Sequence, residues 1–121
     1  MDVGIDARIA RAEALGDQVN GHPEAVPDVV PQLIQLLKLE QEPAVVCALI
    51  YSLGHAWDEE ASLAILRLID VNSAPDEVRL AVAQSLSGGM TSKSAHGKAA
   101  QLLVQLTRDA NGRVRDWACF S

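Results

Sequence analysis

Apolar and polar positions along the chain repeat one arrangement three times: an apolar helix ending, a short polar break, and a second apolar helix. Within each helix the apolar residues recur every three to four positions, which is typical of an amphipathic α-helix. The step between copies is about 32–37 residues, and self-similarity at such a period is typical of repeat proteins built from helix pairs. The three copies are "LIQLLKLEQEPAVVCALIYSLG" from Leu33, "ILRLIDVNSAPDEVRLAVAQSLSG" from Ile65 and "LLVQLTRDANGRVRDWACFS" from Leu102.

The second helix of each copy contains an aligned valine, at Val45, Val78 and Val114. Small or apolar residues follow each valine at the third, fourth, seventh and eighth positions, as far as the chain extends. At 100° per residue these positions form one stripe, so we expect that face to be buried. The residues expected in the core are Leu33, Leu37, Val45, Leu49, Leu53, Ile65, Ile69, Val78, Val82, Leu86, Leu102, Leu106, Val114 and Ala118.

The polar breaks have the residue types of helix starts and turns. Pro43 and Pro75 stand where the second helices open, a position at which proline loses no needed hydrogen bond. "DANG", from Asp109, has turn chemistry, with an Asn-Gly pair able to take positive φ. The segment 87–97, "SGGMTSKSAHG", is expected to be the one long flexible connection.

The N-terminal part contains a fainter copy of the second helix. Residues 5–16 end in the same Leu-Gly pair, and Gly16, Gly54 and Gly88 fall where a helix favours a C-terminal glycine. We therefore expect a single domain over residues 1–121, with a partial repeat at about 5–16 and repeats at about 28–57, 58–90 and 95–121.

Composition agrees with a helical domain. The 121 residues are 49% apolar but only 3% aromatic, so the core must consist of Leu, Ile, Val and Ala, and good helix formers are abundant. No apolar run approaches the roughly 18 residues of a membrane span. The N-terminus has no secretory pattern, so a cytoplasmic location without membrane association is expected.

The net charge of −6 is unevenly distributed, with −9 over residues 1–90 and +3 over residues 91–121. An acidic body does not suit nucleic acid, whose binding depends on neutralising phosphates with Lys and Arg. The basic C-terminal portion is of a size more typical of a solvated face. We expect no nucleic-acid partner.

Candidate catalytic and metal-binding groups are sparse. Cys47 and Cys119 are too few and too far apart for a disulfide framework or a metal-binding pair. The acidic run 58–60 has two interpretations: a metal or acid–base cluster, or the opening turn of a helix at Glu59, where negative charge is stabilising. No phosphate loop, nucleophile elbow or HExxH helix is present. The sequence thus predicts no enzyme activity, metal or cofactor.

"APDEVRLAVAQSLSG" and "DANGRVRDWACFS" resemble the Asp, Val-Arg, Ala, Leu-Gly consensus of HEAT repeats, most closely the bacterial PBS-lyase HEAT-like repeats. The resemblance covers about residues 28–121. It implies an all-α fold of about seven helices, a right-handed α-solenoid of stacked antiparallel helix pairs (an α-α superhelix). In such a solenoid the second helices line one concave face.

The resemblance also implies a polar ladder between neighbouring units, formed by an Asp in the break and an Arg after the aligned valine. Asp109, Arg79 and Arg115 occupy matching positions. The first unit departs from the pattern, with Val46 in place of the Arg and Glu40 in place of the Asp. In the second unit the insertion "VNSAP" displaces the acid, so a partial ladder is expected.

The concave face is expected to present the second and sixth positions after each aligned residue. Apolar side chains there, with Tyr51 as an anchor, predict a groove that binds a protein segment. Alternatively, these residues pack against loops or adjacent units. The positions are Ile9, Cys47, Leu80 and Asp116 in the first set and Glu13, Tyr51, Gln84 and Phe120 in the second.

Two function classes follow. The first is a non-enzymatic interaction module: a scaffold, adaptor or regulatory subunit. The second is a subunit of a bilin-lyase-like enzyme, because bilin lyases are similar to this repeat type, although a larger chain and a pigment pocket would then be expected. DNA glycosylases of HEAT type need a basic groove, whereas these positions hold Glu13 and Asp116 and no Lys or Arg.

The C-terminal repeat lacks the closing leucine that Leu53 and Leu86 supply earlier. Terminal repeats normally present a polar outer face, yet Trp117 and Phe120 lie close together here. Either the chain is a fragment of a longer product, or another copy covers this end. Self-association as a homo-oligomer through the C-terminal repeat is the expectation in both cases.

Overall fold

The computed structural model describes residues 4–86 and 93–119, and within them the chain contains helices and no strand. This confirms the predicted all-α class and the expected number of helices. No helix in these two ranges is long and apolar enough to cross a bilayer. The elements are α1 (Ile5–Val19), a 3-10 turn (Pro23–Ala25), α2 (Val26–Leu39), α3 (Pro43–His55), α4 (Glu59–Leu68), α5 (Asp76–Leu86), α6 (Lys93–Leu106) and α7 (Gly112–Cys119).

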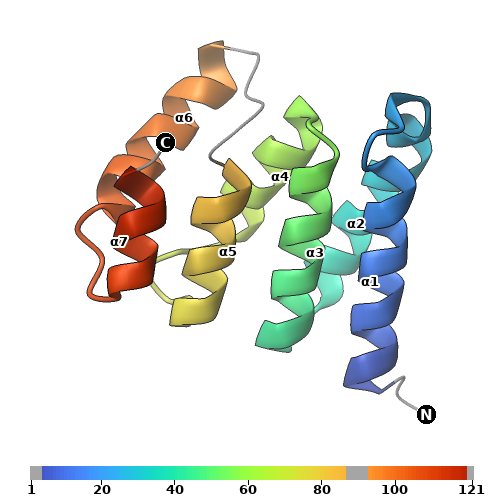
Figure 1. The fold of residues 1–121 in the computed structure, drawn as a ribbon, viewed down its shortest axis with the longest axis horizontal. Helices are drawn as coiled ribbons and strands as arrows, with labels where there is room; N and C mark the ends of the chain where they lie inside the picture. The colour runs from blue at the N-terminus through green and yellow to red at the C-terminus, as the bar shows by residue number, and fades with distance from the viewer. Residues whose placement is uncertain (1–3, 87–92, 120–121) are drawn as a thin grey trace.

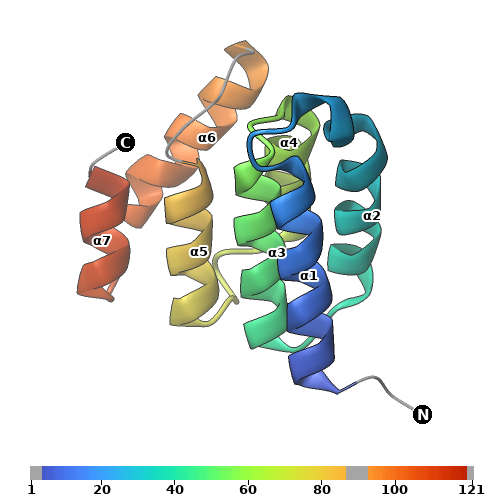
Figure 2. The ribbon, with the colours of Figure 1, turned by 45° about the vertical axis from the view of Figure 1, so that its right-hand side comes forward.

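The helices form two rows (Figures 1 and 2). The chain runs upward in α1, α3, α5 and α7 and downward in α2, α4 and α6 in the view of Figure 1, so successive helices are antiparallel. We call the first set the odd row and the second set the even row. Each helix contacts its neighbours within its own row and the adjacent helix of the other row. Helices distant in sequence, such as α1 and α3, therefore lie side by side.

The core lies between the two rows and consists of aliphatic side chains. The residues predicted for the core are buried, except for Ile69 and Leu102, which are partly buried and pack against it. Ile69 follows α4, which ends at Leu68, and its backbone is extended, so the helix does not direct its side chain toward the other row. The aliphatic stripe found in the sequence is therefore the contact surface between the rows.

The helix starts agree with the sequence except at the last helix. Pro43 is the first residue of α3, and Asp58 precedes α4 and accepts a hydrogen bond from the backbone N–H of Ala61 at 3.3 Å. The acidic run 58–60 thus opens a helix. At the predicted Asn-Gly turn φ is not positive; instead the Asn111 side-chain oxygen accepts hydrogen bonds from the first N–H groups of α7, at 2.9 and 3.4 Å.

The prediction of C-terminal glycines is wrong for two of the three positions, and Gly88 lies outside the described residues. Gly16 and Gly54 lie inside α1 and α3, and the left-handed conformation after these helices belongs to Gly21 (φ 79°) and Trp57 (φ 50°). The two helical glycines instead permit close helix contact. A Cβ at Gly16 would lie 2.5 Å from Oγ of Ser52.

The same contact recurs one unit later. A Cβ at Gly54 would lie 3.0 Å from Cβ of Ser85. Each serine also donates a hydrogen bond to the preceding helix of the odd row, from Ser52 Oγ to the carbonyl of Ala12 at 2.7 Å and from Ser85 Oγ to that of Ile50 at 3.3 Å. Glycine and serine at fixed positions therefore set a short spacing between α1, α3 and α5.

The predicted connection 87–97 is too long at its C-terminal end. The helix α6 begins at Lys93 and includes Gly97, while residues 87–92 lie outside the described part. One helical glycine costs only about 1 kcal/mol relative to alanine. Buried Ala99 and Leu106 fix α6 against its neighbours, and this packing outweighs the local preference for a loop.

Candidate functional site

The predicted partner-binding positions lie on the odd row, but they differ in exposure. Glu13, Tyr51 and Asp116 are exposed, and Gln84 is half-buried. Phe120 lies outside the described residues. The remaining three positions are partly buried and pack against the core: Ile9, Cys47 and Leu80. These three therefore fit the alternative expectation, packing within the domain.

Tyr51 and Gln84 connect two helices on this surface. The Tyr51 hydroxyl of α3 donates a hydrogen bond to Oε1 of Gln84 on α5. Tyr51 remains 36% exposed, so an aromatic side chain that is hydrogen-bonded to its neighbour also faces solvent. Burial raises the pKa of Tyr51, and nearby Cys47 adds to the rise while the positive charge of Arg113 opposes it. The hydroxyl is therefore uncharged at neutral pH and able to donate.

Cys47 lies beside this tyrosine, and its thiol stays protonated at neutral pH. Burial, with a further contribution from the carboxylate of Glu77, raises its pKa to about 11. Because the thiolate is the reactive form of cysteine, a half-buried thiol with such a pKa is unreactive near neutral pH. This position contributes surface and not chemistry.

Two charged residues outside the predicted positions also act on this surface, Arg113 on Tyr51 and Glu77 on Cys47. Both residues occupy the position before the aligned valine, which is not among the positions predicted for the groove. Arg113 on α7 lies close enough to lower the pKa of Tyr51. The surface is thus acidic near α1 and mixed in charge near α7.

A depression of about 290 Å³ lies between α1 and α3. Sequence reasoning missed two residues of its rim, Asp17 and His55. Each follows a predicted residue by four positions, one helical turn further along, so continuing the count by one turn would have found them. The residues that line this α1–α3 depression are Glu13, Asp17, Ala48, Tyr51, Ser52 and His55.

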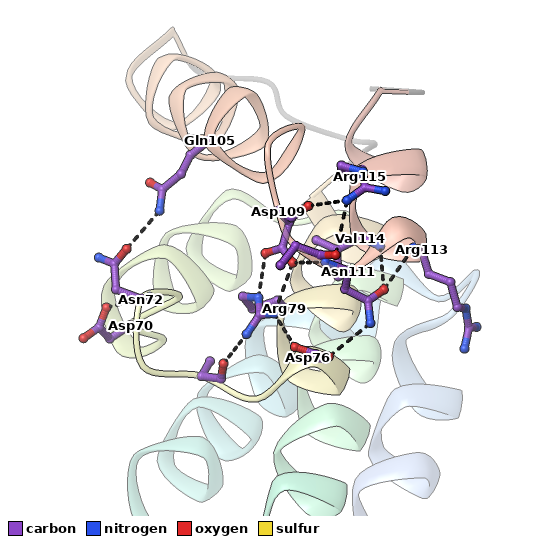
Figure 3. Close-up of polar contacts among 12 residues, drawn as sticks. Asp70, Asn72, Asp76, Arg79, Gln105, Asp109, Asn111, Arg113, Val114 and Arg115 are labelled. Atoms are coloured by element: carbon purple, nitrogen blue, oxygen red, sulfur yellow. Dashed lines mark hydrogen bonds and ion pairs between the residues drawn. The ribbon is translucent and has the colours of Figure 1, made fainter.

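An ion pair at the loop edge of the rows connects α5 to the break before α7 (Figure 3). Nε of Arg79 donates to Oδ2 of Asp109 at 2.6 Å and Nη2 donates to Oδ1 at 3.1 Å. Such a two-pronged, charge-assisted pair fixes orientation as well as distance. The guanidinium of Arg79 holds the pKa of Asp109 below its usual range, opposed by burial. Arg79 and Asp109 thus form the ion pair expected from the ladder positions, whereas Arg115 donates to the backbone carbonyl of Asp109 at 2.8 Å.

A second pair of the same geometry was not predicted. Nε of Arg8 donates to Oε1 of Glu40 at 2.9 Å, joining α1 to the break before α3. Burial acts to raise the pKa of Glu40, but the N–H of Glu42 and the Arg8 guanidinium outweigh it and lower that pKa. Arg8 follows the aligned Ala7, so extending the alignment to the first helix would have revealed it. Between these two pairs the equivalent position is Val46, which is buried.

The arrangement offers no metal site in the described ranges 4–86 and 93–119, where no group of three or more His, Cys, Asp or Glu side chains is placed to hold an ion. No protein-family model, curated protein or solved structure matches this chain.

Proposed function

We propose that the chain is a non-enzymatic protein-interaction module, a HEAT-like right-handed solenoid whose concave face is the odd row. The observation that carries the proposal is Tyr51: it is held by Gln84, remains open to solvent, and lies beside a depression on that row. The ladder pair of Arg79 and Asp109 and the order of helices within the two rows support the repeat assignment.

The short spacing within the odd row supports its place on the concave side. In a curved stack of helix pairs, the row whose helices lie closer together is on the inside of the curve. Gly16 against Ser52 and Gly54 against Ser85 bring α1, α3 and α5 together at their contact points. We therefore place the partner along the odd row, across α1, α3 and α5.

The Tyr51 side chain is held in place before a partner binds. Tyrosine is among the residues that contribute most at interfaces, with losses of about 2 kcal/mol or more on truncation at central positions. Ordering a free side chain on binding costs about 0.5–1.5 kcal/mol. Because Tyr51 is already bonded to Gln84, much of that cost is met in the free protein. The pair therefore suits an anchor for a partner.

The test compares two double variants of the full chain. Tyr51→Ser with Gln84→Ala removes the anchor, while Leu39→Ser with Val104→Ser removes two exposed apolar residues from the even row, where they are 80% and 58% exposed. Leu80 is left intact because it packs against the core. Partners captured from lysate are identified by mass spectrometry, then each is purified and its affinity is measured for both variants.

We expect the odd-row variant to lose about tenfold or more in affinity for the purified partner, and the even-row variant to keep it. Far-UV circular dichroism and thermal melting check that both remain folded. Equal losses in the two variants, or no loss in the odd-row variant, would refute the proposed face.

A further inference from the structure

We infer that the partner segment carries a lysine or arginine whose side chain enters the α1–α3 depression. This inference rests on the proposed function and specifies the chemistry of the partner. The depression is bounded by the carboxylates of Glu13 and Asp17 on α1 and by Tyr51 and His55 on α3. The charge, size and aromatic wall of this depression favour the same occupant.

The negative charge at the rim of the depression favours a cation. Glu13 and Asp17 lie one helical turn apart on α1, and like charges at this spacing repel each other. Within the described residues neither carboxylate has an ion-pair or hydrogen-bond partner. A cation placed between them relieves the repulsion and gains two attractive contacts at once. Arg113 lies toward the α7 side of Tyr51, so the acidic side of this surface faces α1.

The volume of the depression favours a single side chain as its occupant. A volume of about 290 Å³ lies just below the range of small-molecule pockets, about 300–1,000 Å³. It suits one long side chain better than a separate ligand. Ala48 and Ser52 are short residues of the lining, which leaves room for the methylene groups of a lysine or arginine.

Tyr51 supplies the aromatic part of the lining. A guanidinium or ammonium group over the face of a tyrosine ring within about 6 Å gains a cation–π attraction. Tyr51 is fixed by its hydrogen bond to Gln84, so the position of its ring is set before binding. Carboxylates on one side and an aromatic ring on the other are complementary to a cation with an apolar stem.

A second depression makes a useful comparison. It has a volume of about 200 Å³ and lies between α2 and α4 on the even row. Its lining includes Lys38 and Arg67 beside Glu60, so its cations outnumber its one acid. An incoming cation therefore has no comparable preference for it.

The experiment titrates isotope-labelled full chain with three capped tetrapeptides, of arginine, glutamate or glutamine, and follows backbone amide shifts by NMR. We expect the arginine peptide to shift amides of residues 13–17 and 48–55 most, and the glutamate peptide to leave them unchanged. Glu13→Gln with Asp17→Asn should weaken arginine-peptide binding about tenfold. The matched control, Asp28→Asn with Glu60→Gln, removes the same charge from the even row and should weaken it less than twofold.

Shifts spread over all acidic surfaces, or an equal loss in the control variant, would mean attraction by net charge alone and would overturn the inference. Failure of the arginine peptide to bind would overturn it as well. Such a failure leaves the proposed function standing if the Tyr51 variant still loses its purified partner. If that variant keeps its partner, the odd-row face itself is refuted, so the two failures are distinguishable.

Discussion

Replacing Gly16 by alanine tests whether glycine sets the spacing of the odd row. The added Cβ would lie 2.5 Å from Oγ, 2.9 Å from Cβ and 3.1 Å from Cα of Ser52. Real Cβ contacts are almost never as short as the first two, and Cβ and Cα of Ser52 cannot be moved by rotating a side chain. Helices α1 and α3 must therefore move apart, and the hydrogen bond from Ser52 to the carbonyl of Ala12 must weaken.

The expected magnitude follows from three terms. Forcing an extra methyl group into a packed contact costs about 1–3 kcal/mol. Losing the buried hydrogen bond of Ser52 costs about 1 kcal/mol. Alanine gains about 1 kcal/mol over glycine through helix propensity. We therefore expect Gly16→Ala to lower the free energy of unfolding by about 1–3 kcal/mol, although the substitution favours the isolated helix.

Gly97→Ala is the matched control. Gly97 also lies in a helix, α6, but a Cβ there meets nothing within 4 Å. Helix propensity alone then predicts a gain of about 0.5–1 kcal/mol. Urea denaturation followed by far-UV circular dichroism measures the free energy of unfolding of both variants. If Gly16→Ala were as stable as Gly97→Ala, the close approach of α1 and α3 would be refuted.

Three further predictions concern the core, an ion pair and a thiol. Leu49 is only 1% exposed, so Leu49→Ala should lower the free energy of unfolding by about 2–5 kcal/mol in the same urea assay. A decrease of less than about 1 kcal/mol would contradict its burial. The pKa of Asp109 in the folded protein is below the unfolded value of about 3.9. The ionised carboxylate therefore stabilises the fold at a pH above about 3.9, and this stabilisation is lost as the pH falls through the folded-state pKa. Acid titration of Asp109→Asn should accordingly show a shallower loss of stability than the parent chain. Cys47, with a pKa of about 11, should react with iodoacetamide at least about tenfold more slowly than exposed Cys119, as peptide mass spectrometry can measure; equal rates would contradict its burial.

Part of the candidate site was predictable from helical periodicity. Counting from the aligned residues found Glu13, Tyr51 and Gln84, because positions on one helix face follow from sequence alone. Periodicity could not show that Leu80 packs against the core, because that depends on how close α5 lies to α3 and α7. It also could not show that Arg113 lies near Tyr51, because these residues belong to different helices.

The sequence by itself determined the class of fold and the buried stripe of each helix. Periodicity, proline at helix openings and the scarcity of aromatics are local properties, and they are sufficient to specify helices and their apolar faces. Only the tertiary structure decided what Gly16 and Gly54 do. A glycine near a helix end suits either a left-handed cap or a close helix contact, and the position of Ser52 or Ser85 across the contact selects the second.

The same division holds for the acidic residues. Sequence order placed Glu40 in a polar break, but its partner Arg8 is 32 positions away, and only stacking of α1 on α3 brings the two together. Glu13 and Asp17 have no such partner within the described chain, although their local sequence looks no different from other acidic turns. Whether a carboxylate is paired or available to a ligand depends on which helix lies opposite. That is decided by packing between helices and not by the sequence around the residue.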